Sequence, residues 1–212
     1  MKKTKSWSRN LNWEEITGTE REEILERVNP IDGKYKTNVG TKIMRTNVSF
    51  YNDNVFVLCL TNPDWKKNLE IYYFWDSGNL FRLNGTSPPI HEVNAKAPIK
   101  LDKSNVIDYL RFFCFFVHAE NGPFLLFETI DQLEIPLKLM SDKEVEILKD
   151  IVYTAKLNNI NNKGNFLVTS MVWHYKDVFA ARFEIQKSGM IEMLEDETVV
   201  ENLSQKPIVL LN

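Results

Sequence analysis

The densest apolar stretch of the chain runs from Leu101 to Glu128 and reads LDKSNVIDYLRFFCFFVHAENGPFLLFE. It predicts a helix that begins at Asp102 or Ser104, because both residue types accept hydrogen bonds from the first N–H groups of a helix. The helix would end near Ala119, ahead of an Asn-Gly-Pro stop. A helix that is apolar on nearly every side is normally buried on every side. The pattern therefore predicts a central, aromatic-rich helix inside the fold.

Much of the remaining sequence alternates apolar and polar residues, as half-buried strands do. Strands are predicted over residues 43–51, 54–60, 68–75, 80–83, 124–127, 166–175, 178–186 and 190–194. Residues 76–78 would form a hairpin loop with Gly78 in the left-handed position. Helices are predicted over 20–28 and 142–156, the second starting with a capping box. Short hairpins without strict alternation of strands and helices predict an α+β fold, in which antiparallel sheet and a C-terminal meander pack around the central helix.

The chain of 212 residues fits a single α+β domain over residues 1–212. Residues 84–98 are rich in turn formers and predict a long functional loop. If the domain divides into subdomains, the seam would fall at 84–102. The Asn-rich residues 158–165 predict another loop, and the acidic residues 192–201 predict a tail.

Charge and cysteine content limit the classes of function. The net charge of −3 offers no basic field for a nucleic-acid backbone, so no nucleic-acid partner is expected. The longest apolar run, residues 112–117, is far shorter than the ~20 residues of a membrane-spanning helix. The two cysteines lie in apolar runs and no signal peptide is visible, which indicates the cytoplasm. A protein that is exported without a cleaved signal would show the same sequence features, so signal-independent secretion stays open. The oligomeric state stays open.

One polar stripe on the central helix offers the first candidate site. Asp108, Arg111 and His118 follow helical spacing together with Ser104 and Phe115, while the other faces are apolar. As a site, Asp108 and Arg111 would bind or polarise a ligand, with His118 as acid or base at the rim. The alternative is a solvent-facing stripe with an i,i+3 ion pair.

Metal and cofactor chemistry find little support in the residue types. Cys114 and His118 have a spacing that could ligate a metal, but the chain has only two Cys and three His and no familiar ligand pair recurs. We therefore expect no metal and no cofactor. Nucleotide-binding, serine-hydrolase and metalloprotease motifs are absent as well. A Cys114 thiol among phenylalanines would have a raised pKa and be inert.

The C-terminal meander offers the second candidate site. With Lys176-Asp177 as the first turn, Thr169 would lie opposite Glu184. With residues 187–189 as the second loop, Glu184 would lie opposite Glu192. The two carboxylates would be an acid/base pair or a cation site, or they would simply lie on a solvated sheet face with Arg182 between them.

The segments YLRFFCFFVHAENGPF and VFAARFEIQKSGMIEMLEDE resemble a set of uncharacterised bacterial proteins. The resemblance covers roughly the second half of the chain: the aromatic helix with its Gly-Pro-Phe exit, and the final Ser-Gly hairpin. It implies a bacterial origin and a shared architecture. No activity is assigned to that set, so no site residue follows from it.

These observations lead to two hypotheses of function. The first is a non-enzymatic bacterial binding or protein-interaction module that presents a sheet edge, the 84–98 loop or an aromatic pocket to an unknown protein or small-molecule partner. The second is a small hydrolase or transferase that uses Asp108, Arg111 and His118, or the Glu184 and Glu192 pair. The sequence leaves open whether the protein is an enzyme.

Overall fold

The structure is a computed structural model that describes residues 6–8, 11–31, 35–52, 54–65, 69–76, 78–130 and 140–205. The contacts of the chain group into two compact units, divided between Pro98 and Ile99. The N-terminal unit contains the described residues from 11 to 98. The C-terminal unit contains residues 6–8 and the described residues from 99 to 205.

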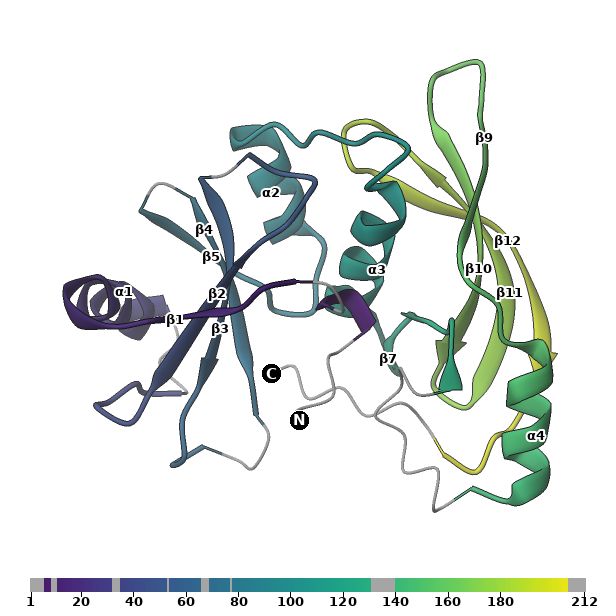
Figure 1. Ribbon diagram of the computed structural model, residues 1–212, viewed down its shortest axis with the longest axis horizontal. Coiled ribbons are helices and arrows are strands. Elements are labelled where there is room, and N and C mark those ends of the chain that lie inside the picture. Colours follow the sequence, from purple (N-terminus) through teal and green to yellow (C-terminus); the bar gives the residue numbers. More distant parts are fainter. Residues whose placement is uncertain are drawn as a thin grey trace. The chain divides into compact units, whose positions relative to one another are not determined.

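The N-terminal unit is a five-stranded antiparallel sheet with one helix on each side (Figure 1). The strands follow one another in chain order: β1 (Glu14–Ile16), β2 (Lys42–Asn47), β3 (Val55–Thr61), β4 (Ile71–Asp76) and β5 (Asn79–Arg82). The helices are α1 (Gly18–Ile31) and α2 (Pro88–Lys96). Gly78 has φ 92° at the β4–β5 turn, which confirms the hairpin and the left-handed glycine, but Asp76 pairs with Asn79 as part of β4, so the loop is one residue shorter than the predicted 76–78.

Each face of this sheet has its own core, because strand residues alternate between the faces. Ile24 and Val28 of α1 pack against Leu58 and its neighbours on one face. On the other face, Tyr51 contacts the ring of Phe74, and its hydroxyl donates a hydrogen bond to Asn94 of α2. The sheet is therefore covered by one helix on each side.

The predicted loop over 84–98 is wrong, because most of it is helix α2. Pro88 and Pro89 occupy the first helical positions, where a missing N–H and a fixed φ are favourable. The same residues are typical of turns, and so they misled the prediction. Ile90 and Val93 are fully buried and attach the helix to its unit.

The C-terminal unit is built around the predicted aromatic helix. Its elements are η1 (Ser6–Ser8), α3 (Val106–Phe116), β6 (His118–Ala119), β7 (Gly122–Pro123), β8 (Leu125–Leu126), α4 (Asp142–Ile151), β9 (Lys156–Ile160), β10 (Phe166–His174), β11 (Asp177–Ile185) and β12 (Ile191–Val200). The main sheet has the order β12-β11-β10-β8, and β9 pairs with the other part of β10. Helix α3 lies against one side of this sheet (Figure 1). The α+β class with antiparallel sheet and an aromatic cluster around a helix is thus confirmed.

The aromatic cluster includes a residue from the far N-terminus. Phe112 and Phe116 of α3 are fully buried, and their ring centroids lie 4.7 Å apart. Trp7 of η1 packs edge-on against both, at 5.5 and 5.0 Å. Tyr109 donates a 2.7 Å hydrogen bond to the carbonyl of Gly189, which ties the helix to the β11–β12 loop. Edge-to-face pairs of this kind add stability beyond the area that they bury.

Helix α4 confirms the predicted capping box. The Ser141 side chain accepts from the Glu144 N–H, and the Glu144 carboxylate accepts from the Ser141 N–H at 2.8 Å. The N–H of Ser204 also donates to Glu144, at 2.7 Å. Together with the Ser141 groups, this Ser204 hydrogen bond lowers the pKa of Glu144 to about 2.

Three predictions in the C-terminal sheet need correction. Residues 158–160 belong to strand β9 and not to a loop, and all three are exposed. Residues 192–200 are part of strand β12 and not a tail. The β10–β11 turn consists of Tyr175-Lys176, so that Thr169 lies opposite Arg182. Tyr175 takes the left-handed conformation, with φ 53°. The slip of two positions keeps every side chain on its predicted face.

Candidate functional site

Arg111 lies between two carboxylates of the C-terminal unit. Its Nε and Nη2 donate to the two oxygens of Glu128 at 2.6 and 2.7 Å, a bidentate pair. Its Nη1 donates to Asp108 at 2.6 Å. Asp108 and Arg111 come from one side of α3, whereas Glu128 follows the short strand β8. The cluster therefore joins the helix to the sheet.

Burial distinguishes the two carboxylates. The Glu128 side chain is 2% exposed, whereas that of Asp108 is 49% exposed. The N–H of Ala155 donates to Glu128 at 2.9 Å, just ahead of β9. Burial alone would lower the pKa of Arg111, but its hydrogen bonds to Glu128 and the attraction of both carboxylates outweigh burial and raise it. Arg111 therefore stays a cation, and each of its three guanidinium nitrogens donates to a protein carboxylate.

Two members of the predicted stripe lie outside the helix. Since α3 begins at Val106 and ends at Phe116, Ser104 precedes it and His118 lies on β6. The backbone of Val117 is extended, and the chain then returns through the β6–β7 hairpin. The Nε2 of His118 lies 3.2 Å from the carbonyl oxygen of Phe115. Burial lowers the pKa of His118, against a smaller opposing effect of this hydrogen bond. In the described part of the chain, no hydrogen bond or ion pair joins His118 to Arg111 or Asp108.

Glu128 is the member of this cluster that sequence reasoning missed. A signal for it exists: Arg111 is the only lysine or arginine between Tyr109 and Glu128, and Glu128 directly follows the apolar run 124–127. A lone cation and a lone carboxylate in two apolar segments are expected to pair when the segments are buried.

The described residues contain neither a cluster of metal-ligating side chains nor an exposed cysteine. No group of three His, Cys, Asp or Glu side chains there could hold a metal ion. Cys114 is buried, and burial raises its pKa to about 12, as predicted from its apolar neighbours. A thiol with this pKa carries almost no thiolate at neutral pH.

The second pair of candidate carboxylates lies on the C-terminal sheet. Glu184 pairs with Glu192 across β11 and β12, as the sequence predicted. The side-chain amides of Asn165 and Asn161 donate to Glu184 at 2.5 and 2.8 Å. These two hydrogen bonds lower the pKa of Glu184, with a further contribution from Lys163. Glu184 is consequently an anion at neutral pH and a poor general acid.

Further carboxylates extend this acidic surface along β12. Directly paired residues share a face of an antiparallel sheet, so Glu195 and Glu197 lie on the same face as Arg182 and Ala180. Arg182 donates to Glu195 at 2.5 Å. Among the described residues, Glu192 and Glu197 form no ion pair. We call strand β12 together with Glu184 the acidic edge.

The backbone of β12 lies at the rim of the sheet. Among the described residues, no strand pairs with its outer side. Every residue from 192 to 199 is exposed, including the apolar Met193, Leu194 and Val199. Leu194 and Val199 are the extra residues of two irregularities in the β11–β12 register. Sequence reasoning missed the full length of this strand, because its acidic residues resemble a tail.

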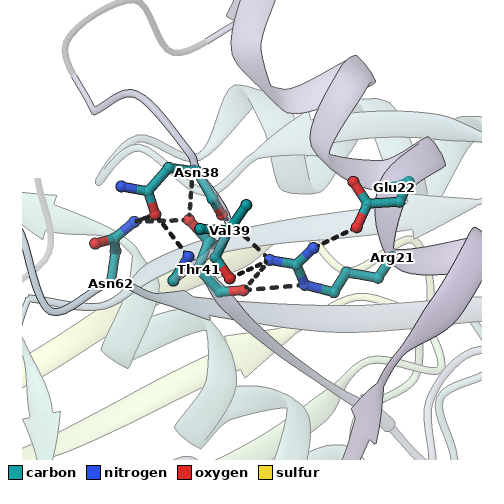
Figure 2. Close-up of polar contacts among 7 residues, drawn as sticks. Arg21, Glu22, Asn38, Val39, Thr41 and Asn62 are labelled. Carbon is teal, nitrogen blue, oxygen red and sulfur yellow. Dashed lines mark hydrogen bonds and ion pairs between the residues drawn. The ribbon is translucent and has the colours of Figure 1, made fainter.

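The N-terminal unit contains a polar cluster that no sequence motif predicted (Figure 2). Arg21 of α1 donates to the main-chain carbonyls of Asn38, Val39 and Thr41, at 3.2, 3.0 and 2.8 Å through Nη2. The amide of Asn62 donates to the side-chain oxygens of Asn38 and Thr41, at 2.8 and 2.7 Å. The guanidinium is thereby committed to the turn that precedes β2. This cluster braces the loop that precedes β2.

Comparison with known proteins gives no family for this chain. No protein-family model matches it, and neither the curated proteins nor the solved structures contain a match. Within the described ranges, no helix is long and apolar enough to cross a membrane.

Proposed function

We propose that this protein is a non-enzymatic interaction module that binds a cationic partner protein through the acidic edge. One observation carries the proposal: β12 is a strand of ten residues at the rim of its sheet, and it is exposed from residue 192 to residue 199. Sheet edges present N–H and C=O groups that can pair with another chain. The carboxylates beside this edge give it a negative charge, so a positively charged partner would be complementary to it.

The hydrogen bonds of the candidate residues on and near α3 favour binding over catalysis. Arg111 is already hydrogen-bonded to Glu128 and Asp108. The Nε2 of His118 lies 3.2 Å from the main-chain carbonyl of Phe115, and among the described residues His118 forms no hydrogen bond to either carboxylate. A catalytic site needs an acid or base that can reach a substrate proton, and the hydrogen bonds of these groups serve the fold instead. The hydrolase or transferase hypothesis therefore has less support.

The setting in which the module works is also part of the proposal. Cys59 and Cys114 are buried free cysteines, as suits a reducing compartment. Together with the resemblance of the second half of the chain, this supports a role in the bacterial cytoplasm.

Titration followed by amide NMR tests the proposed function. The ¹⁵N-labelled full chain is titrated with a lysine-rich peptide of nine residues, and separately with a peptide that has glutamate at the lysine positions. We expect the lysine-rich peptide to shift the amide signals of β11 and β12, and the glutamate-rich peptide to leave them in place. If neither peptide moves those signals, or both move them equally, the acidic edge is not a binding surface for a cationic partner.

A further inference from the structure

Resting on the proposed function, we infer the form of the partner: an extended segment with Lys or Arg at every second residue, which adds to the sheet as a strand beside β12. In strand addition, main-chain hydrogen bonds supply affinity and alternate side chains supply specificity.

The side-chain pattern follows from the two faces of β12. Glu192, Glu195 and Glu197 lie on the outer face, and Asp196 pairs with the buried Ala181 on the core-facing side. Met193 also lies on that side, beside Phe183, and is 36% exposed. Because successive residues of a strand point to opposite faces, a neighbouring strand would place one alternate set of residues opposite the glutamates. Its other set would lie on the side of Met193.

Two features limit what can pair with this edge. A second copy of β12 would bring its own glutamates against Glu192 and Glu197, and like charges directly opposite each other destabilise a sheet. The extra residues Leu194 and Val199 interrupt the regular ladder, so the longest uninterrupted stretch is 195–198. Such bulges bend and twist an edge. The charge disfavours self-association, and the irregularities favour a short partner strand.

The experiment compares peptides that differ only in pattern or backbone. The first alternates lysine with valine or threonine over nine residues. The second has the same composition with its lysines grouped at one end, and the third is the alternating peptide with every second amide N-methylated. Affinities are measured by fluorescence anisotropy with the full chain at low and at physiological salt.

Matched variants of the protein separate the two faces of the strand. Glu197→Lys reverses a charge on the outer face, whereas Asp196→Lys makes the same change one residue away on the core-facing side. We expect Glu197→Lys to weaken binding of the alternating peptide by about tenfold, on the order of a reversed cross-strand charge pair, and Asp196→Lys to weaken it less. Amide spectra of both variants establish that they remain folded.

The outcomes separate the two proposals. We expect the alternating peptide to bind more tightly than the grouped one. We expect the N-methylated alternating peptide to lose this advantage in affinity. Equal binding of all three peptides at the acidic edge would overturn strand addition and leave the proposed function in place. Absence of any effect of cationic peptides on β12 would overturn both. Equal effects of Glu197→Lys and Asp196→Lys would contradict the assignment of the faces.

Discussion

Removal of the Glu128 carboxylate should destabilise the C-terminal unit far more than removal of Asp108. Both carboxylates bind the same guanidinium, but the Glu128 side chain is 2% exposed and the Asp108 side chain 49%. Glu128→Ala takes away both bonds of the bidentate pair with Arg111 and the acceptor of the Ala155 N–H. Breaking a buried ion pair from one side costs about 3–5 kcal/mol. Asp108→Ala breaks an exposed pair and should cost less than ~1 kcal/mol.

Urea unfolding measures this difference. With a urea dependence of about 2 kcal/mol per M, Glu128→Ala should lower the midpoint by about 2 M, and Asp108→Ala by less than ~0.5 M. Because the chain has two compact units, the transition is followed through amide signals of β10, which belongs to the affected unit. This readout avoids averaging over two transitions.

A double substitution tests why Glu128→Ala destabilises the unit. If the cost of Glu128→Ala comes from a buried and unmatched Arg111, replacing both with Glu128→Leu and Arg111→Met should restore most of the stability. Equal and small midpoint shifts for Glu128→Ala and Asp108→Ala would refute the reasoning. In that case the bidentate pair would contribute no more than a surface ion pair.

Three further predictions concern the core, a helix end and a thiol. Phe116→Ala should cost about 3–5 kcal/mol in urea unfolding, and Phe113→Ala clearly less, because Phe116 is fully buried and Phe113 is not; equal losses would place the two rings in the same environment. The pKa of Glu144, about 2 in the folded chain, lies below its unfolded value of about 4.3, so its contribution to stability is present above that value and is lost as the pH falls toward 2. Ser141→Ala should raise this pKa in a carboxyl NMR titration and cost about 1 kcal/mol, and an unmoved titration would contradict the capping box. Cys114, with a pKa of about 12, should react with iodoacetamide at pH 8 only after unfolding; rapid labelling of the native chain would contradict its burial.

The fold class could be predicted because the local patterns and the tertiary structure agree. The apolar run that became α3, the Gly78 turn and the capping box of α4 each depend on nearest neighbours in sequence. The pairing of Glu184 with Glu192 was also predictable, since the loop between their strands is short. These features needed no knowledge of what packs against them.

The failures occurred where tertiary contacts decide. Pro88 and Pro89 suit both a turn and the first turn of a helix, and the burial of Ile90 selects the helix. β9 is polar, and its pairing with β10 makes it a strand. Spacing placed His118 on the helix, but the chain leaves α3 at Phe116 and pairs His118 with Pro123.

In the candidate site, too, the contacts within one element could be predicted and the contacts between elements could not. Spacing predicted the contact of Arg111 with Asp108 because both lie on one helix. The stronger contact, with Glu128, crosses from helix to sheet and is invisible to periodicity. The acidic edge was only partly predictable, because an exposed edge strand buries neither face and its sequence resembles a solvated tail.

Hydrogen exchange along β12 tests the central claim most directly. Exchange rates of the β12 amides are measured in the free full chain and in the presence of the alternating lysine peptide. In an antiparallel pair, every second residue of an edge strand directs its N–H away from its partner. We predict that these outward amides slow by at least about tenfold on binding, while those facing β11 change little. Unchanged rates at the outward amides, with the peptide demonstrably bound, would contradict the account.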